Sequence, residues 1–327
     1  MPRHLDTTIT SFPIAGEFKI SRGSKTSADV VICTIWDGNA RGRGECVPYK
    51  RYGETLDSVT SQIVSFREAI ERGANRSEIA GLMPPGAARN AVDCALWDLE
   101  AKISGQSVAA AIGVSEPKPL TTAYTISLDT ADAMAAQAGK YAHRALLKVK
   151  TGTEDDETRI RAVRAAAPLA AIVLDANEGW SEDNVVRHLQ IAAECGVALV
   201  EQPLPAGHDD ILARIAHPLL ICADESVHAR GDLSALVGKY DAVNIKLDKT
   251  GGLTEALAMK AEARRLGFSI MAGCMVGSSL AMAPAVLLAQ DVDFVDLDGP
   301  LLLAEDCEPA LTYRESLVYP PERVLWG

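Results

Sequence analysis

Residues 145–150 read Ala-Leu-Leu-Lys-Val-Lys, a short apolar run that ends in charge. Similar runs recur from residue 121 to about residue 303, separated by alanine-rich segments with helical periodicity. Nearly continuous apolar strands that alternate with helices predict a parallel sheet buried on both faces. Eight such units favour a closed barrel over an open sheet. The runs lie at residues 121–128, 145–150, 171–175, 198–201, 219–224, 242–247, 268–272 and 294–297.

The segments between the runs carry signals for helix starts and stops. Ser181 and Thr254 offer capping oxygens at helix starts, and Gly196 and Gly267 stand where helices should end. No clear helix follows the eighth run. We therefore expect an α/β fold, a modified TIM barrel of (β/α)7β type, over residues 121–304. The segments between strands with the clearest pattern are residues 155–167, 181–195, 254–266 and 278–290.

The first 120 residues follow a different pattern, typical of an α+β domain. Two antiparallel strands are expected at residues 8–18 and 29–36, with turn residues at 37–39. Two helices are expected at residues 56–72 and 88–103, with Gly105 as the stop of the second. We predict that residues 1–120 form a capping domain and that a C-terminal segment, residues 305–327, returns to it.

The composition is that of an ordinary soluble globular protein. Hydrophobic residues make up 48% of the 327 residues, and the formal net charge of −12 argues against nucleic acid or an anionic membrane as partner. The seven cysteines form no C-x-x-C pair, so they indicate reduced thiols rather than disulfides or a zinc site. With no apolar leader or membrane-length run, the cytoplasm is the expected location. An exposed barrel rim suggests a homo-oligomer.

Strand parity places two lysines inside the predicted barrel. Lys148 and Lys150 share one face of the second barrel strand, and the outward face of a barrel strand should be apolar because helices cover it. The lysines should therefore point inward at the carboxyl end, where active sites of this fold lie. The same rule puts ionisable side chains at the ends of the next four strands, namely Asp175, Glu201, Asp224 and Lys246.

Each of these residues also has a simpler interpretation. A Lys-x-Lys pair is more often on a solvated strand, and an acid after an apolar run commonly caps a helix. The set as a whole favours a functional site, because each of five consecutive strands would place a buried ionisable side chain at the same height in the barrel. Burial of unpaired charge costs several kcal/mol per ion.

The residue types predict metal-assisted proton transfer. Carboxylates of Asp175, Glu201 and Asp224 suit Mg²⁺, whereas zinc would call for histidine or cysteine ligands. Lys150 and Lys246 come from strands two and six, so a substrate carbon between them would have a base on each face. Nearby Mg²⁺ and Lys148 would lower the pKa of Lys150. The ion would bind a substrate carboxylate and stabilise an enediolate.

As an ordered set, these motifs resemble the enolase superfamily, in particular its muconate-lactonizing-enzyme subgroup, over essentially the whole chain. The resemblance implies that Asp175, Glu201 and Asp224 bind the metal and that Lys150 and Lys246 are the acid/base pair. It also implies that Lys148 contacts the substrate carboxylate. The matching motifs are residues 148–150, 175–177, 201–203, 223–226 and 244–252, together with the helix at residues 90–105.

The eighth run resembles that of dipeptide epimerases within the subgroup. Asp296 and Asp298 share a face, and paired carboxylates suit a substrate α-ammonium group. One of them alone would be explained by a turn near Gly299 and Pro300. Thr125 matches a substrate-contacting threonine of these epimerases.

Two loops, residues 20–25 and 44–54, resemble those of L-Ala-D/L-Glu epimerases. The resemblance implies that Arg22 grips the side-chain carboxylate of a glutamate, although a lone loop arginine is more often solvated. Cys274 would line the pocket on the loop after the seventh run. Gly277 departs from the subgroup, which often has an acid there, so we assign no chemistry to that loop.

The resemblance implies epimerisation of a dipeptide, such as Ala-Glu, at its C-terminal residue, with a role in recycling murein peptides. Alternatives within the subgroup are N-acylamino acid racemase, o-succinylbenzoate synthase and muconate cycloisomerase. Their substrates carry no free ammonium group, so Asp296 and Asp298 disfavour them. Sugar-acid dehydratases would call for a histidine on the seventh run, which has none.

Two interpretations from other classes stay open. A barrel that has lost its chemistry would only bind a ligand, although every acid, base and metal position is filled here. Another Mg²⁺-dependent barrel enzyme, such as an aldolase or a hydrolase, would use the same acids for metal and a lysine for a Schiff base or for water activation.

Overall fold

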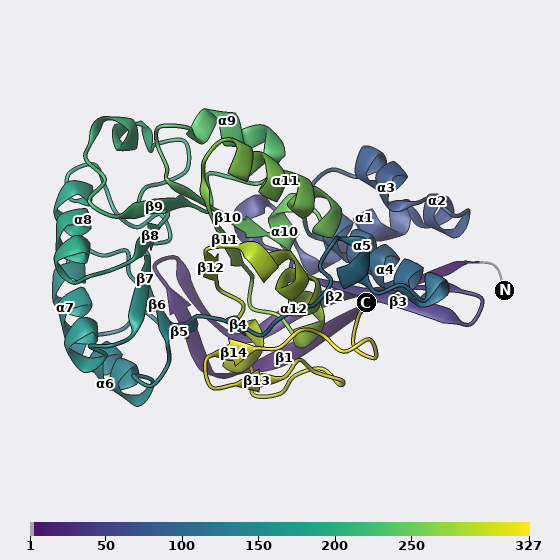
Figure 1. The fold of residues 1–327 in the computed structure, drawn as a ribbon, viewed down its shortest axis with the longest axis horizontal. Helices are drawn as coiled ribbons and strands as arrows, with labels where there is room; N and C mark the ends of the chain where they lie inside the picture. The colour runs from purple at the N-terminus through teal and green to yellow at the C-terminus, as the bar shows by residue number, and fades with distance from the viewer. Residues whose placement is uncertain (1–2) are drawn as a thin grey trace.

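The computed structural model describes residues 3–327. A curled parallel sheet surrounded by helices forms one part, and antiparallel strands with their own helices form a cap beside it. In Figure 1 the cap, in purple and blue, extends to the right of the teal and green barrel. This mixed α/β architecture with a separate N-terminal cap confirms the expected fold class.

The barrel sheet has eight parallel strands in chain order; seven of them fall within one predicted run, and β11 extends one residue beyond the run at residues 268–272. Its two edges meet where Ala123 N donates to Val295 O over 2.9 Å. The sheet therefore curls far enough to bring its first and last strands together. The strands are β5(Tyr124–Ile126), β6(Leu146–Lys150), β7(Ala171–Asp175), β8(Leu199–Glu201), β9(Leu220–Ala223), β10(Ala242–Lys246), β11(Ser269–Gly273) and β12(Phe294–Val295).

The inside of the barrel is layered. At the amino ends of the strands, buried apolar side chains pack into one cluster. Two residues further along, the same face carries an ionisable or polar side chain on every strand of the cluster except β11, where Gly273 stands, because side chains alternate between faces with a period of two. The apolar cluster consists of Ala123, Leu146, Val173, Leu199, Cys222, Ala242 and Met271.

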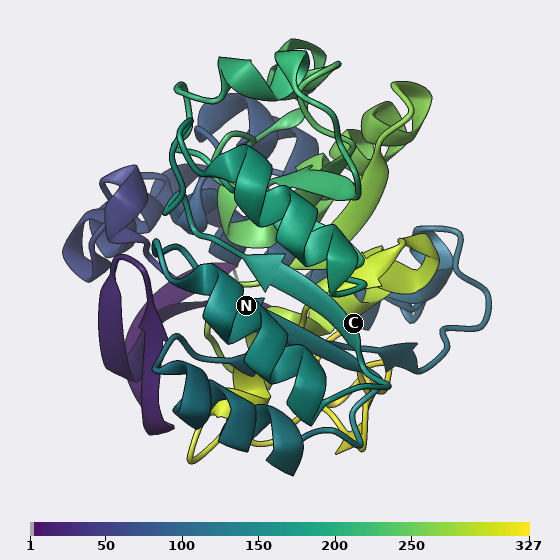
Figure 2. The ribbon, with the colours of Figure 1, turned by 90° about the vertical axis from the view of Figure 1, so that its left-hand side faces the viewer.

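Helices cover the outside of the sheet, and Figure 2 shows those of the first units lying side by side across the strands. Two of the connections depart from the expected repeat: only short helical turns lie between β8 and β9 and between β9 and β10. The helices of the barrel are α6(Ala131–Lys140), α7(Asp156–Ala166), α8(Val185–Glu194), η2(Asp210–Arg214), η3(Arg230–Asp232), α9(Leu233–Leu236), α10(Leu247–Thr250), α11(Leu253–Arg265), α12(Ser279–Leu288), η4(Ala289–Asp291) and η5(Gly299–Leu302).

The two predicted helix caps are wrong, whereas the two predicted stops are confirmed. Ser181 N donates to Asn184 Oδ1, so residues 181–184 form a turn before α8. Thr254 lies inside α11, where its hydroxyl donates to Asp93 of the cap. Gly196 and Gly267 follow the ends of their helices with positive φ, the conformation that glycine adopts most easily.

The cap is built on a three-stranded antiparallel sheet, β1(His4–Ile20), β2(Gly23–Asp37) and β3(Ala40–Cys46). The predicted strands are parts of β1 and β2, which form one long hairpin with its turn at residues 21–22. The predicted turn at residues 37–39 leads instead into β3, a strand that the alternation did not indicate. Figure 1 shows the hairpin crossing from the cap to β6 and β7 of the barrel.

Helices of the cap pack on this sheet. The predicted helix at residues 56–72 is divided at Phe66, whose non-helical ψ separates α1(Leu56–Ser65) from α2(Arg67–Glu71). The long helix α4(Ala87–Ser104) is as predicted, with Gly105 at its end. The remaining cap elements, which the periodicity did not indicate, are η1(Lys50–Tyr52), α3(Arg76–Leu82) and α5(Val108–Ala111).

The C-terminal segment contacts both parts of the molecule. Its strand β13(Tyr313–Arg314) pairs with β14(Leu317–Val318), and β14 pairs with β4(Leu120–Thr121). Further on, Trp326 Nε1 donates to Cys94 O over 3.1 Å, and Gly327 N donates to Asp98 Oδ1 over 2.8 Å. The end of the chain therefore lies against α4 of the cap. The boundaries at residues 120 and 304 stay a prediction.

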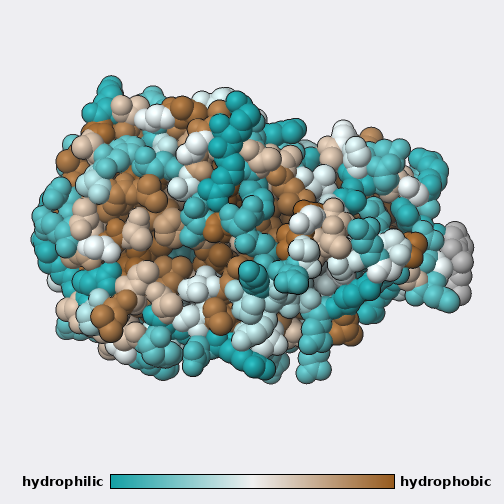
Figure 3. Space-filling view, viewed as in Figure 1, coloured by the Kyte–Doolittle hydropathy of each residue, from teal (hydrophilic) through white to brown (hydrophobic). Residues whose placement is uncertain are grey.

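The surface seen in Figure 3 is hydrophilic along most of its rim, with apolar side chains gathered over the part that contains β6–β9. No helix within residues 3–327 combines the length and the apolarity that crossing a bilayer would require.

Candidate active site

Six ionisable side chains converge inside the barrel at the carboxyl ends of consecutive strands. Two lysines project from β6, and one ionisable residue stands at or just after the end of each of the next four strands. None is more than 6% exposed. Parity placed them all on the inward face, and the structure brings them together. They are Lys148, Lys150, Asp175, Glu201, Asp224 and Lys246.

Lys148 lies at the centre of this cluster. Its Nζ is 2.6 Å from Glu201 Oε2, 2.7 Å from Asp296 Oδ2 and 3.0 Å from Asp175 Oδ2. Burial alone would lower the pKa of Lys148, but the three carboxylates together raise it well above its ordinary value. The side chain is therefore a fixed positive charge.

The two proposed bases stand at opposite ends of the arc of carboxylates. Lys150 Nζ lies 2.6 Å from Asp175 Oδ2. Lys246 Nζ lies 2.6 Å from Asp224 Oδ2 and 3.8 Å from Glu201 Oε1. Because β6 and β10 are separated by three strands of an eight-stranded sheet, the two amines enter the cavity from different sides.

The carboxylates share a buried environment that favours additional positive charge. Burial and the nearby Asp175 raise the pKa of Glu201 to about 7, although Lys148 opposes this. The pKa of Asp224 is held well below its ordinary range, because Lys246 and Lys249 outweigh the effect of burial. Asn244 Nδ2 donates to Glu201 Oε1 over 2.7 Å and fixes one side of that carboxylate.

The donor set of Asp175, Glu201 and Asp224 suits a hard divalent cation, since all three ligands are carboxylates. Glu201 Oε2 accepts no hydrogen bond of regular geometry, although it is buried. As the side chains stand, no three His, Cys, Asp or Glu residues in the part of the chain from 3 to 327 surround a common point. The ammonium groups of Lys148 and Lys246 lie between the carboxylates instead.

The end of β12 supplies a second pair of acids. Asp298 Oδ2 accepts from Thr125 N over 2.6 Å, and burial together with Asp296 raises the pKa of Asp298 to about 7. The second oxygen of Asp296, Oδ1, is buried without a hydrogen-bond partner. Cys274 lies close to both acids, and burial with their charges raises the pKa of its thiol well above the ordinary value. A raised pKa disfavours the thiolate, which is the nucleophilic form of cysteine.

Comparison with known proteins identifies the family. Residues 128–323 match the family described as enolase C-terminal domain-like, and residues 5–113 match the mandelate racemase / muconate lactonizing enzyme N-terminal domain. The chain belongs to the enolase superfamily. The resemblance predicted from the motifs is thereby confirmed.

Two curated relatives of this superfamily member match nearly their whole length. The L-Ala-D/L-Glu epimerase of Escherichia coli K12 is 48% identical over 93% of this chain and 95% of its own. The N-acetyl-D-glutamate racemase of a Pseudoalteromonas species is 43% identical over 91% of this chain and 95% of its own.

Solved structures of the superfamily give the same result. An enolase family member from Agrobacterium tumefaciens with homology to dipeptide epimerases, solved with sodium and L-Ala-L-Glu bound and an ordered loop, is 62% identical. It covers 100% of both chains with a TM-score of 0.99. The dipeptide epimerase of Cytophaga hutchinsonii, complexed with Mg and D-Ala-L-Val, is 27% identical, covers 98% and 94% of the two chains and has a TM-score of 0.92.

In this superfamily member the loop backbone around the carboxylates is held in unusual conformations. Asn177, Glu178 and Gln202 follow β7 and β8 with positive φ, a conformation that costs energy for residues other than glycine. Gln202 is buried, and its Oε1 accepts from Asp224 N over 2.8 Å. Strain at this edge is thus combined with a hydrogen bond that fixes the main chain at Asp224.

Arg22 reaches the barrel from the tip of the cap hairpin. Its guanidinium donates to Asn177 O over 2.7 Å, to Glu178 Oε2 over 3.0 Å, to Glu225 Oε1 over 2.6 Å and to Tyr49 OH over 3.2 Å. The predicted substrate ligand therefore lies over the cavity, but its charge is already paired with two carboxylates.

Three residues near the acids had no role in the sequence interpretation. Lys249 donates to Asp224 Oδ1 over 2.5 Å, Asn244 to Glu201, and Gln202 accepts from Asp224. All three lie within motifs that carried the family resemblance. Membership of these motifs was the one indication that the three residues contact the acids, because nothing in the local sequence pattern distinguishes them.

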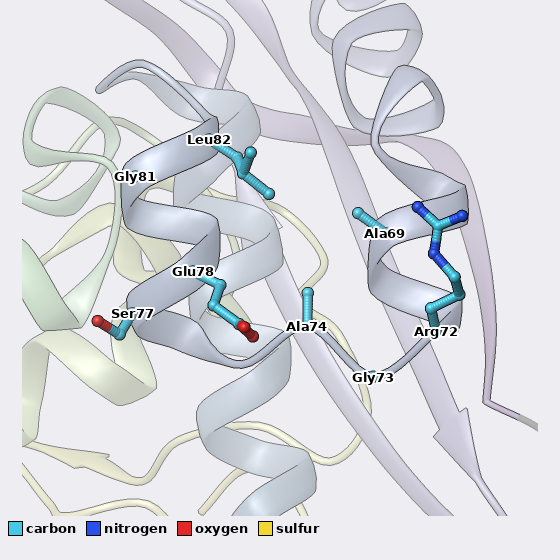
Figure 4. Close-up of a pocket in the computed structure, with 8 residues that line it drawn as sticks. All are labelled: Ala69, Arg72, Gly73, Ala74, Ser77, Glu78, Gly81 and Leu82. Atoms are coloured by element: carbon cyan, nitrogen blue, oxygen red, sulfur yellow. The ribbon is translucent and has the colours of Figure 1, made fainter.

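A hollow on the surface of the cap lies between α2 and α3, away from the barrel (Figure 4). Its two charged lining residues are already used: Arg72 pairs with Glu68, and Glu78 accepts from Asn75 N in a capping box. Both charged groups of the hollow are thus engaged within the cap, whereas six ionisable side chains converge in the barrel, so the barrel interior is the candidate site.

Proposed function

We propose that the protein is an isomerase, a Mg²⁺-dependent dipeptide epimerase whose substrate is L-Ala-D/L-Glu or a close analogue. The observation that carries this proposal is the position of Lys150 and Lys246 at the two ends of one buried arc of carboxylates. Relatives named as L-Ala-D/L-Glu epimerases, and a relative solved with L-Ala-L-Glu bound, support the choice of substrate. A role in recycling murein peptides is part of the proposal.

Asp175, Glu201 and Asp224 would hold the ion, and a dipeptide epimerase that shares this fold was solved with Mg. When bound, Mg²⁺ supplies positive charge beside the substrate carboxylate, which lowers the barrier to removal of the neighbouring α-proton. Lys148 adds a permanent charge at the same place, since its pKa is raised well above the ordinary value.

The proton moves between two amines. One lysine, as the neutral amine, accepts the α-proton on one face of the carbon, and the other, as ammonium, returns a proton on the opposite face. Burial lowers the pKa of Lys246, but Asp224 and Glu201 raise it more, so that it exceeds its ordinary value. The two lysines exchange these roles when the reaction runs in the opposite direction.

Asp296 and Asp298 select the free amino end of the dipeptide. Asp296 Oδ1 is buried without a partner, which an ammonium group would satisfy. Thr125 holds Asp298 in place through its backbone N–H. Cys274 lines the same wall of the cavity.

The test follows deuterium exchange at the α-carbon. We expect L-Ala-L-Glu, incubated with the protein and Mg²⁺ in D₂O, to lose its glutamyl α-proton signal and to give L-Ala-D-Glu. EDTA should stop the exchange, and Mg²⁺ should restore it. In Lys246→Met, epimerisation should fall by roughly 10²–10⁴-fold, while the isomer whose proton faces Lys150 still exchanges. No exchange with any dipeptide of a broad panel would contradict the proposal.

A second candidate is racemisation of N-acetylglutamate, which the Pseudoalteromonas relative favours. That substrate has no ammonium group for Asp296 and Asp298. We expect kcat/KM for L-Ala-L-Glu to exceed that for N-acetyl-L-glutamate, and Asp298→Asn to narrow the difference. The reverse preference in the unmodified protein would make the racemase the correct assignment. The o-succinylbenzoate synthase and muconate cycloisomerase alternatives would each require turnover of their own substrates.

A further inference from the structure

The loop that follows Lys150 packs main chain to main chain against the loop that follows Asp175. Thr151 N donates to Asp175 O over 2.9 Å, which extends the ladder between β6 and β7. A Cβ atom added at Gly152 would lie 2.4 Å from Ala176 O, and the φ of Gly152 is +114°. Glycine is the residue that accepts both conditions. The position of the Lys150 backbone therefore depends on how these two loops are held together.

One buried carboxylate joins the two loops. Asp156 is the first residue of α7 and is 0% exposed, and its Oδ2 accepts from Gly152 N over 2.6 Å and from Thr153 N over 2.9 Å. The same oxygen accepts from Trp180 Nε1, in the loop after β7, over 2.7 Å. The Thr153 hydroxyl donates to the other oxygen over 2.8 Å. These hydrogen bonds come from the two loops and not from the helix to which Asp156 belongs, so its carboxylate connects the loops instead of capping α7.

The surroundings hold this carboxylate and its partner in place. Trp180 is 2% exposed, and its N donates to Pro203 O over 3.0 Å, in the loop after β8. Arg159 lies 3.7 Å from Asp156 Oδ1 and compensates part of the buried charge. Hydrogen bonds to an ionised acceptor are about twice as strong as those between neutral groups. Asp156 is thus a rigid link between the carboxyl ends of β6 and β7.

We infer that Asp156 is a positioning residue for Lys150, which sets where that amine stands relative to the α-carbon of the substrate. The inference rests on the proposed dipeptide epimerase function and adds a residue that acts through another side chain. Lys246 stands on β10, which three strands separate from β6. Loss of the Asp156 carboxylate should therefore impair proton transfer on one face of the α-carbon and spare the other. A misplacement of about 1 Å can lower a rate by about 10²-fold.

The experiment measures exchange through each lysine separately. Lys246→Met leaves exchange through Lys150, and Lys150→Met leaves exchange through Lys246, so Asp156→Ala is added to each of these variants. Deuterium uptake at the glutamyl α-carbon of L-Ala-L-Glu and of L-Ala-D-Glu is followed in D₂O with Mg²⁺. We expect exchange through Lys150 to fall by about tenfold or more, in kcat rather than in KM, and exchange through Lys246 to stay unchanged.

Three further variants complete the test. Asp156→Asn should keep most of the rate, because its amide oxygen can accept from the donors at Oδ2 and its nitrogen can donate to the Thr153 hydroxyl. Trp180→Phe removes the bond between the loops and should lower the same exchange, so it replaces Asp156→Ala if that protein does not fold. Asp93→Ala is the matched control. Asp93 is also buried and accepts from Thr254 N over 3.0 Å and from the Thr254 hydroxyl, but it joins the cap to α11, so the ratio of the two exchange rates should not change.

Equal losses of the two exchange rates in Asp156→Ala would overturn the assignment, because they indicate a general structural role. Undiminished exchange through Lys150 would overturn it as well, and so would a loss in Asp156→Asn as large as in Asp156→Ala. Thermal unfolding of each variant separates misfolding from misplacement of the amine. Failure of the unmodified protein to exchange the α-proton of either dipeptide would refute the proposed function instead.

Discussion

Lys249 is among the most completely buried side chains of the protein, although it carries charge. Its ammonium donates to Asp224 Oδ1, to Asp224 O and to Asn244 O, so all three of its protons are used. Burial lowers the pKa of Lys249, and Asp224 opposes this. The residue fixes one oxygen of a proposed metal ligand while the other faces Lys246.

Replacement of Lys249 by methionine should therefore be costly. Removal of one partner of a buried ion pair leaves Asp224 uncompensated, and we expect a loss of about 3–5 kcal/mol in the free energy of unfolding. Urea denaturation measures this. Arg187→Met is the control, because Arg187 is exposed and pairs with Glu157 at the surface, where such pairs contribute about 0–1 kcal/mol. Equal losses in the two variants would contradict the argument.

At the scale of residues, strand parity was sufficient to predict the inward acids and lysines. The period of two and the apolar outer face together decide which side chains enter the barrel. Parity could not identify Lys249, Asn244 or Gln202 as partners of those acids. Their contacts join different strands and depend on distances that only the closed sheet defines.

At the scale of elements, β3 packs on α4 without room for side chains between them. A Cβ atom added at Gly44 would lie 2.1 Å from Ala91 O, and one added at Gly42 would lie 2.1 Å from Ala95 O. Only glycine at these two positions allows the strand and the helix to approach this closely.

Gly44→Ala should force the strand and the helix apart. We expect a loss of about 1–3 kcal/mol in stability, or more, since overpacking shifts backbone as well as side chains. Gly81→Ala is the matched control: Gly81 lies within α3, its added Cβ meets nothing within 4 Å, and alanine favours helix by up to about 1 kcal/mol. A Gly44→Ala protein as stable as the unmodified one in thermal unfolding would disprove the packing argument.

The eight barrel strands and α4 could be predicted because long apolar patterns determine them. The short elements could not. α1 and α2 are separated at Phe66 by a local backbone change, and β3 is mostly glycine, arginine and other residues without a clear alternation. The helical turns that replace full helices after β8 and β9 left no distinct signal.

At the scale of the whole molecule, buried acids join the cap to the barrel. Glu45 on β3 accepts from Ser278 N over 2.8 Å and from the Ser278 hydroxyl. Asp248, which follows β10, accepts from Val47 N over 3.0 Å and from Asn90 Nδ2 over 2.8 Å. Burial raises the pKa of Glu45 to about 7, and that of Asp248 to about 7.

This interface should make stability depend on pH. Because Glu45 binds its proton more tightly in the folded state than at its ordinary value of 4.5, its contribution is present at acidic pH and is lost as the pH rises from about 4.5 through 7. Glu45→Gln should remove this dependence, on the order of 1–3 kcal/mol, when urea unfolding is compared at pH 4.5 and pH 8. The free energy of unfolding of the unmodified protein, relative to that of Glu45→Gln, should fall as the pH rises. A relative stability that stays constant or increases would contradict the prediction.

The sequence predicted the cap as a unit, but it did not predict the hydrogen bonds that join the cap to the barrel. Glu45 and Asp248 read as ordinary polar positions of a strand and a loop, since their partners are far away in the sequence. The ion pairs of Arg22 with Glu178 and Glu225 could not be predicted either, because they depend on how the hairpin lies against the barrel.

The β1–β2 hairpin is attached to the barrel partly by main-chain atoms: Leu128 N donates to Lys19 O over 3.0 Å. A bond of this kind does not depend on which side chain occupies position 19. The tip can therefore accept new sequences while keeping its place, and the two lysines proposed as bases stand on other strands. Changes in this short loop, by evolution or by design, can therefore alter the substrate specificity of the enzyme without changes to the residues proposed for catalysis.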